Sequence, residues 1–192
     1  MRAIVTIAAC LAALGCDAPA DEELVPAREA GKLPGEAGAA QPVEEEAGPI
    51  VVEESVTVAA DPDEVWDLVG GACDIADWHM GVEDCEIVAG ADGEVGAVRA
   101  LNGGAVQEEF TAFDANTRTH SYVMTEGPFA GMDYEGTLSV MPGPAGGAII
   151  TWRDTVSPPP EERTDAGNFV RGLVGAGMEG MRQLVEGAPP AP

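Results

Sequence analysis

The chain has 192 residues and a formal net charge of −25, with 34 acidic side chains against 9 basic ones. This excess of negative charge repels nucleic-acid phosphates and anionic lipid headgroups, so neither nucleic-acid binding nor a basic contact with a membrane surface is expected. Apolar residues make up 45% of the chain, enough for a packed domain, while 25 glycines and 15 prolines indicate long loops or linkers.

The first residues are typical of a secretory signal. Arg2 is followed by an apolar run over residues 3–14 that is too short to span a bilayer. The run ends in "AALGC", which resembles a bacterial lipobox, so we expect removal of residues 1–15 and lipidation of Cys16. The acyl chains would anchor the protein in the cell envelope, facing the periplasm or the cell exterior. An ordinary cleaved signal without a lipid is the alternative.

The next segment has the composition of a tether. Residues 16–49 hold no aromatic side chain, and Pro, Gly, Ala and Glu dominate them. Such a segment cannot bury enough apolar surface to offset its chain entropy, so a disordered acidic linker is predicted. One domain is expected over residues 50–187, followed by a disordered tail at 188–192.

The domain begins with a strand and two short helices. Residues 50–58, "IVVEESVTV", alternate apolar and polar side chains as a half-buried strand does. In "DPDEVWDLVG", Asp61 is placed to cap a helix and Pro62 to occupy its first position. A glycine pair at 70–71 ends that helix, and a second short helix is predicted over about residues 72–78.

Six further strands and a long helix follow. Turn-forming Gly, Asn, Asp and Pro residues separate the strands, which we predict near residues 82–89, 95–101, 104–113, 119–126, 131–141 and 147–156. After "SPPPEE", apolar residues recur at helical spacing from Phe169 to Val185. This helix contains five glycines, each costing roughly 1 kcal/mol against Ala, so a close approach to the sheet or room for a ligand is needed to explain them.

The element order predicts an α+β fold. An antiparallel sheet of about seven strands would curve around the long C-terminal helix, with the two short helices placed after the first strand.

The same order and several motifs resemble the START-like or SRPBCC superfamily, especially its bacterial polyketide cyclase/dehydrase-type members. The matching stretches are "ADPDEVWDLVG", "IADWHMGVEDCEI", "GAVRAL", "QEEFTAFDANTRTHSYVMTEGPF" and "TWRDT". The resemblance implies a helix-grip fold with an elongated cavity between the sheet and the C-terminal helix. It implies little about activity, because the superfamily includes cyclases, hydrolases, lipid carriers and receptors. Met80 departs from the proline that many relatives have after the Trp-His pair.

Strand parity places a charged pair on the inner face of the sheet. If "LNGGAV" is a hairpin with a two-residue Asn-Gly loop, Arg99 lies opposite Val106 and diagonal to Glu108. That face continues through Phe110 and Ala112, so it is otherwise apolar. Arg99 and Glu108 would either orient a polar group of a ligand or form a self-contained structural ion pair.

The predicted cavity wall combines this pair with aromatic and methionine side chains on inward-facing positions. Core packing is the competing interpretation for each of them. The predicted residues are Trp78, His79, Arg99, Glu108, Phe110, Tyr122, Phe129, Tyr134, Trp152, Met178 and Met181.

Four cysteines remain to be assigned. Cys10 would leave with the signal and Cys16 would carry the lipid, so Cys73 and Cys85 are left in a compartment that permits disulfides. We predict a disulfide between them, with two separate buried thiols as the alternative. No metal site is predicted, because two thiolates and one histidine fall short of a closed zinc site.

The sequence contains no nucleophile elbow, P-loop, dinucleotide fingerprint or zinc-protease motif. His79, His120 or Glu108 could transfer protons near neutral pH, but no pattern assigns them that role. We therefore predict a binding domain with no cofactor and no catalytic residues, which holds a small hydrophobic ligand such as a lipid, isoprenoid or polyketide-like molecule. The alternatives are a cyclase or dehydratase using acid-base chemistry, and a partner-binding surface over a collapsed cavity.

Overall fold

The computed structural model describes residues 48–187, and the predicted signal, lipidation site, linker and tail lie outside them. In chain order the elements are β1 (Ile50–Val58), α1 (Pro62–Val69), α2 (Ile75–Trp78), β2 (Cys85–Ala89), β3 (Val98–Leu101), η1 (Asn102–Gly104), β4 (Val106–Asp114), β5 (Thr119–Glu126), β6 (Glu135–Pro142), η2 (Pro144–Gly146), β7 (Ala148–Val156), η3 (Pro160–Glu162) and α3 (Arg163–Glu186).

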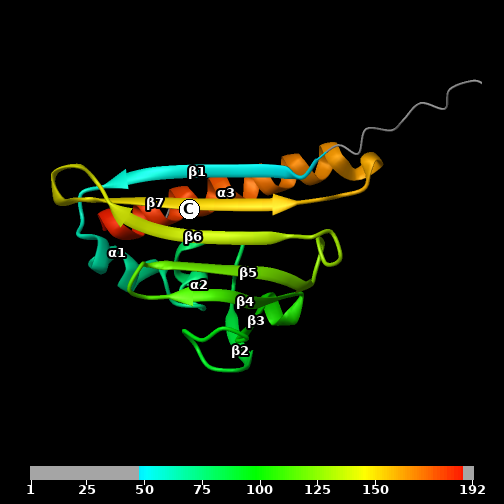
Figure 1. Cartoon of the computed structure of the whole chain (residues 1–192), viewed down its shortest axis with the longest axis horizontal. Helices are drawn as coiled ribbons and strands as arrows, with labels where there is room; N and C mark the ends of the chain where they lie inside the picture. The colour runs from blue at the N-terminus through cyan, green and yellow to red at the C-terminus, as the bar shows by residue number, and fades with distance from the viewer. Residues whose placement is uncertain (1–47, 188–192) are drawn as a thin grey trace, which may run out of the picture. The chain divides into compact units, whose positions relative to one another are not determined.

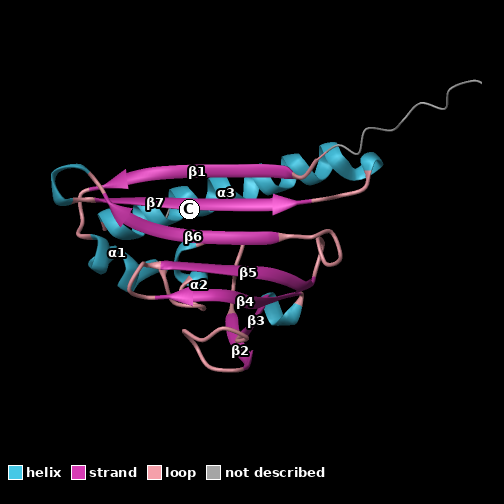
Figure 2. Ribbon diagram, viewed as in Figure 1, coloured by secondary structure: helices cyan, strands magenta, loops and turns pink. Residues whose placement is uncertain are grey.

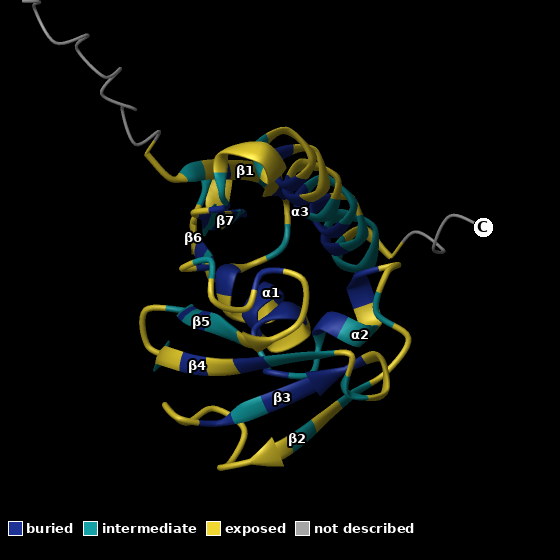
Figure 3. Cartoon of the chain, turned by 90° about the vertical axis from the view of Figure 1, so that its right-hand side faces the viewer, coloured by how far each residue is buried: buried dark blue, intermediate teal, exposed yellow. Residues whose placement is uncertain are grey.

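The seven strands form one antiparallel sheet in the order β1-β7-β6-β5-β4-β3-β2. Consecutive strands pair from β2 to β7, and β1 closes the series by pairing with β7 (Figures 1 and 2). The long helix α3 packs against β1 and β7, and α1 and α2 fill the bend of the sheet beside it (Figure 3). The predicted helix-grip architecture is confirmed.

Local sequence explains the start of the helical layer. The side chain of Asp61 accepts a hydrogen bond from the Asp63 N–H at 2.9 Å, and Pro62 occupies the first turn of α1. At the last residue of the described chain, Gly187 adopts φ 67° and caps α3.

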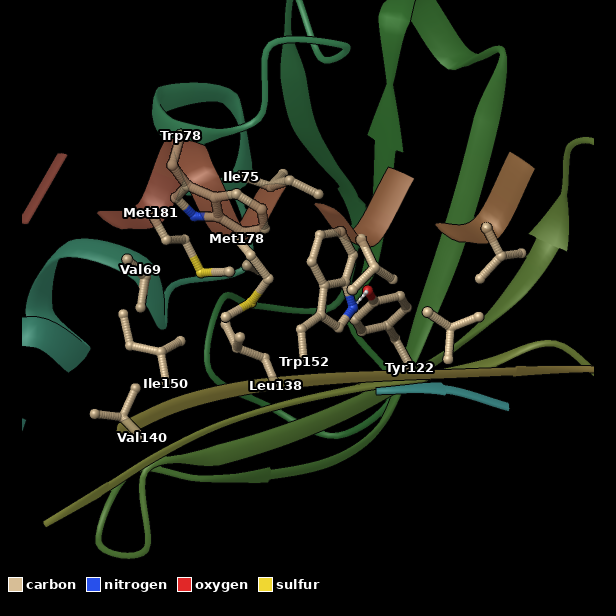
Figure 4. Close-up of a cluster of buried hydrophobic side chains, with 14 of the residues drawn as sticks. Val69, Ile75, Trp78, Tyr122, Leu138, Val140, Ile150, Trp152, Met178 and Met181 are labelled. Atoms are coloured by element: carbon tan, nitrogen blue, oxygen red, sulfur yellow. Dashed lines mark hydrogen bonds between the residues drawn. The ribbon is translucent and has the colours of Figure 1, made fainter. Parts of the chain in front are cut away.

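The core lies between the sheet and α3. The inward residues of β7, Ala148, Ile150 and Trp152, are fully or almost fully buried, as the alternating pattern predicts. Trp78 of α2 meets Trp152 edge to face with ring centroids 5.4 Å apart, and Met178 of α3 packs in the same cluster (Figure 4).

Two glycines of α3 explain part of its unusual composition. A Cβ at Gly180 would overlap the carbonyl oxygen of Trp78, and one at Gly177 would overlap the ring of Trp152. The helix therefore approaches α2 and β7 more closely than alanine would allow. Gly172, by contrast, has nothing within 4 Å of its Cβ position, and nothing in the structure requires a glycine there.

The predicted register of the β3–β4 hairpin is wrong by two residues. Four residues rather than two connect the strands, and Asn102, Gly103 and Gly104 all adopt positive φ. Leu101 consequently pairs with Val106, and Arg99 lies directly opposite Glu108 instead of diagonal to it.

Other strand predictions also require correction. The register shifts between Phe110 and Ala112, so Ala112 faces solvent and Phe113 turns toward the core. Strand β6 starts at Glu135 rather than 131, because positive φ at Gly131 and Asp133 keeps the preceding residues in a loop. β2 starts three residues later than predicted, at Cys85, and β3 starts three residues later, at Val98.

Candidate ligand cavity

An apolar cavity of about 210 Å³ lies between the sheet, α2 and the middle of α3. Residues from α2 and the loop after it, β3, η1, β4, β5, the loop before β6, β7 and α3 converge on it. They are Ile75, His79, Gly81, Val82, Leu101, Asn102, Val106, Glu108, Tyr122, Met124, Pro128, Phe129, Tyr134, Trp152, Phe169 and Leu173. This apolar wall with a few placed polar groups is the composition typical of small-molecule sites.

Six of the predicted wall residues lie on this cavity: His79, Glu108, Tyr122, Phe129, Tyr134 and Trp152. The other five are placed elsewhere, which corrects the prediction. Arg99, Phe110, Met178 and Met181 are buried in the packed core, and Trp78 lines a separate cleft between α2 and α3. An inward position on a strand or helix determines burial, but the neighbouring side chains determine whether any space remains beside it.

The charged pair lies at the sheet side of the cavity. Arg99 Nε donates to Glu108 Oε2 at 2.7 Å, and Arg99 Nη1 donates to the carbonyl oxygen of Ala72 at 2.8 Å. Burial alone would lower the pKa of Arg99, but the charge of Glu108 and its hydrogen bond outweigh it and the pKa is raised, so the guanidinium stays charged. Only Glu108 of the pair contributes to the cavity wall.

Aromatic groups hold this pair in place. The Arg99 guanidinium carbon lies 4.5 Å from the centroid of the Tyr122 ring, a cation–π arrangement. The Tyr122 hydroxyl accepts a hydrogen bond from Trp152 Nε1 at 3.1 Å (Figure 4). Gly136 of β6 makes this possible, because a Cβ there would overlap the end of the Tyr122 side chain. Burial raises the pKa of Tyr122 well above its ordinary value, so its hydroxyl stays protonated.

Asp154 is a buried polar residue that the sequence analysis did not single out. It is fully buried in β7, and its Oδ2 accepts a hydrogen bond from the Tyr134 hydroxyl at 2.8 Å. Burial raises the pKa of Asp154 to about 7. The alternation that places Trp152 inward could have identified Asp154, which lies two residues later in "TWRDT".

His79 is held by both ring nitrogens at the boundary of the cavity. Its Nδ1 accepts from the Gly81 N–H at 3.0 Å, so Nε2 carries the proton and donates to the Leu173 carbonyl oxygen at 3.1 Å. Burial lowers the pKa of His79, so the neutral form predominates. His120 is buried in the core and its pKa is lowered to about 3, mainly by burial and then by the charge of Arg99. Both histidines are therefore held as neutral structural groups.

Cys73 and Cys85 lie at the edge of the domain beside the short helix α2. Their Cα atoms are 5.4 Å apart and a disulfide joins the two side chains. The bond joins the segment before α2 to the start of β2, and so closes a covalent loop around α2, Trp78 and His79.

Within residues 48–187, no three His, Cys, Asp or Glu side chains are grouped as metal ligands. Over the same range, no helix combines the length and the hydropathy that crossing a membrane would need.

The curved sheet, the long helix packed against it and the partly open, mostly apolar cavity define a fold typical of ligand binding. The chain belongs to the family described as "Polyketide cyclase / dehydrase and lipid transport", whose model matches residues 49–186. None of the curated proteins compared with the chain matches it.

Solved structures show the same fold. XoxI from Bacillus cereus is 24% identical with a TM-score of 0.63, and the match covers 71% of this chain and 95% of XoxI. A protein from Thermobifida fusca is 24% identical with a TM-score of 0.64, covering 70% of this chain and 92% of its own. Ara h 8.0201 is 20% identical with a TM-score of 0.54, covering 73% and 99%. At these identities the likeness concerns the fold alone.

Proposed function

We propose that this domain binds a small, neutral, mostly apolar molecule that carries a hydroxyl group, and that it does so without catalysis. The observation that carries the proposal is the polar part of the cavity wall. Glu108 and Tyr122 lie on a mostly apolar wall, and each has one hydrogen-bonding position that no described residue fills.

The two free positions are complementary to a hydroxyl group. Glu108 uses Oε2 for Arg99, so its Oε1 is available as an acceptor. The Tyr122 hydroxyl accepts from Trp152 and still has its own proton to donate. A ligand hydroxyl can donate to the first and accept from the second.

The same geometry disfavours an anionic ligand. A ligand carboxylate would meet the carboxylate of Glu108 inside an apolar wall, and the adjacent Arg99 already interacts with that group. Like charges at short range in a poorly solvated site are costly. A neutral alcohol, phenol or isoprenoid alcohol fits better than a fatty acid.

The cavity volume limits the size of the ligand. At about 210 Å³ it is smaller than the roughly 300–1,000 Å³ typical of drug-sized sites. A ligand of one or two rings, or a short branched chain, fits without rearrangement. A longer lipid would have to displace the aromatic side chains at the mouth, Phe129 and Phe169.

We further propose that the domain is tethered to the cell envelope through a lipid on Cys16. The signal-like residues 1–15 and the acidic linker that follows support this proposal. The disulfide between Cys73 and Cys85 is compatible with an oxidising compartment. Replacing Cys16 by Ser should move the protein from the membrane fraction to the soluble fraction; an unchanged distribution would contradict lipidation.

Three matched probes test the ligand class: 2-naphthol, naphthalene and 2-naphthoate, which share a ring system and differ in their polar group. We expect 2-naphthol to bind the full chain at least about tenfold more tightly than naphthalene, the value of one good hydrogen bond, and 2-naphthoate to bind most weakly. Equal affinity for 2-naphthol and naphthalene, or no binding of either, would reject the proposal.

The variant Glu108→Gln tests the residue. It keeps the shape of the side chain. Its single amide oxygen is needed as the acceptor for Arg99, so the NH2 donor replaces the free acceptor at Oε1 and the preference for 2-naphthol over naphthalene should fall. Glu109→Gln is the control, because Glu109 is the next residue on β4 and is exposed on the opposite face. Native mass spectrometry of the purified protein would identify a natural ligand that stays bound.

Proton-transfer chemistry in the same cavity is the second candidate. It is favoured by one observation: Tyr134 lies on the cavity wall and is hydrogen-bonded to Asp154, whose pKa is raised to about 7. Recovery of the co-purified ligand with an altered mass after incubation would favour catalysis, and recovery of the unchanged ligand favours binding.

A further inference from the structure

Asp154 has one carboxylate oxygen without a partner in the interior of the domain. The residue lies in β7 opposite Val52 of β1 on one side and Gly136 of β6 on the other, and it is fully buried. Its Oδ2 is hydrogen-bonded to Tyr134, but no described residue contacts its Oδ1 through a hydrogen bond. Such an unsatisfied buried oxygen is costly, and the cost is larger when the group is charged.

The shortest hydrogen bond to Asp154 comes from a side chain of the loop that lines the cavity. Residues 127–134 connect β5 to β6, and Tyr134 is the last residue of this loop. Its ring is stacked on Phe129 with centroids 5.6 Å apart and an interplanar angle of 14°. Phe129 in turn meets Phe169 of α3 at 5.5 Å, and all three aromatic side chains lie on the cavity wall.

A second contact anchors the same loop to the end of β7. The Ser157 N–H donates to the Met132 carbonyl oxygen at 2.7 Å. Among these contacts, the hydrogen bond between Tyr134 and Asp154 is the one that joins the aromatic side of the cavity to a fully buried carboxyl group. Movement of Tyr134 away from Asp154 would disturb its stack with Phe129.

We propose that Asp154 and Tyr134 form a proton-controlled latch, in which protonation of the buried carboxyl group holds the 127–134 loop over the cavity and its ionisation favours opening. Ionisation spreads the charge over both oxygens, and Oδ1 has no hydrogen-bond partner among the described residues. Opening of the loop lets water reach that oxygen and solvate it.

The surroundings of Asp154 support this direction. Burial is the main cause that raises its pKa to about 7, and the negative charge of Glu108 on β4 adds to it. The hydrogen bond from Tyr134, a weaker one from Trp152 and the charge of Arg99 on β3 all lower the pKa, in that order, without cancelling the shift. Tyr122 on β5 stays neutral, and on β1 the partner is Val52. The buried face of α3 carries no charged side chain. It consists of Ala166, Gly167, Val170, Val174, Gly177, Met178 and Met181.

The sign of the pH effect follows from these values. In the closed state Asp154 titrates near 7, whereas in an open, solvated loop it would titrate near its ordinary value of 3.8. Closing therefore binds a proton between these two values. The latch is strongest in acid, weakens as the pH rises from about 4 to about 7, and changes little above that.

Hydrogen exchange of the loop amides in the full chain tests the latch without any ligand. After correction for intrinsic exchange, the protection of residues 127–134 should fall by up to about tenfold per pH unit between about pH 5 and about pH 7. Asp154→Asn cannot ionise and should show a flat profile. Asp133→Asn is the control, because this exposed carboxylate lies in the same loop and its loss should leave the slope of the wild type.

Tyr134→Phe is a second variant, which tests the latch even if Asp154→Asn does not fold. It removes the hydroxyl alone, and the loop should lose protection relative to the wild type across the whole pH range. The latch is rejected if the wild-type loop shows no pH dependence, if Asp154→Asn keeps the wild-type slope, or if Tyr134→Phe is protected like the wild type.

The consequence for ligand release rests on the proposed function. Dissociation of 2-naphthol should accelerate between about pH 5 and about pH 7 in the wild type but not in Asp154→Asn. If 2-naphthol does not bind at any pH while the exchange profile behaves as described, the proposed ligand fails and the latch stands. If 2-naphthol binds and its dissociation and the loop exchange are both independent of pH, the latch fails and the binding function stands.

Discussion

Arg99 and Glu108 face each other directly across β3 and β4, with Nε and Oε2 2.7 Å apart and both side chains almost completely buried. A pair in this position has lost its hydration, so each charge depends on the other. The consequence is asymmetric: removing one partner costs far more than the pair itself contributes.

Glu108→Ala should therefore destabilise the domain by about 3–5 kcal/mol, because it leaves the Arg99 guanidinium buried and without its counter-ion. Urea unfolding followed by tryptophan fluorescence measures the change. Glu109→Ala is the matched control and should stay within about 0.5 kcal/mol of the wild type. The double variant Arg99→Met with Glu108→Leu should recover most of the loss, since it removes both charges. Unchanged stability of Glu108→Ala would mean that the pair is solvated in solution.

The disulfide between Cys73 and Cys85 should contribute measurably to the free energy of unfolding. It closes a short loop, with a sequence separation of 12, around α2. On the chain-entropy estimate, loss of this bond in the double Cys73→Ser, Cys85→Ser variant costs about 2–3 kcal/mol. Intact mass of protein alkylated before and after reduction checks the bond directly. Alkylation of both cysteines without prior reduction would contradict it.

Most of the helices and strands could be predicted from the periodicity of apolar residues and from helix-capping residues. Alternation in β1 and β7 and the cap at Asp61 depend on interactions between near neighbours, and these are visible in the sequence. The errors fall where the backbone adds residues to a regular pattern. The four-residue β3–β4 connection at Asn102 and the bulge after Phe110 each shift the register, which no two-residue repeat can reveal.

The candidate site was harder to predict than the fold. Residues such as Tyr122 and Trp152 could be placed inward by parity, but Met178 and Met181 share that property and lie in packed core. The distinction depends on side chains from several elements at once. Asp154 was missed because charged residues are usually exposed. Only the alternation of side chains along β7 indicates that Asp154 lies on the same buried face as Trp152.

Two glycines of α3 should respond in opposite ways to substitution by alanine: one variant should lose stability and the other should gain it. Gly180→Ala should destabilise the domain by about 1–3 kcal/mol, because its methyl group would overlap the Trp78 carbonyl oxygen and force α2 away from α3. Gly172→Ala is the control in the same helix. Its Cβ would meet nothing within 4 Å, so it should stabilise the domain by roughly 0.5–1 kcal/mol. Thermal unfolding of both variants decides it; equal effects would mean that helix propensity alone determines the outcome.

The buried histidine His120 should make the domain unstable in acid. Its ring is enclosed by Phe110, Phe113 and Trp66, and its Nδ1 lies 3.1 Å from the Gly70 carbonyl oxygen. Its pKa is about 3 in the folded state and 6.5 as the ordinary value, so the unfolded state binds more protons between these two values. The stability that neutral His120 contributes is therefore complete above about pH 6.5 and is lost as the pH falls toward about 3, at up to about 1.4 kcal/mol per pH unit.

Two other buried groups, His79 and Asp154, also change the dependence of stability on pH, and they act in opposite directions. His79, whose pKa is also lowered, adds to the loss in acid, whereas Asp154, whose pKa is raised to about 7, opposes it between about 4 and 7. The free energy of unfolding against pH, measured by urea unfolding, separates them. His120→Gln should reduce the acid loss and Asp154→Asn should steepen it. A His120→Gln profile parallel to that of the wild type would show that the ring is hydrated in the folded state.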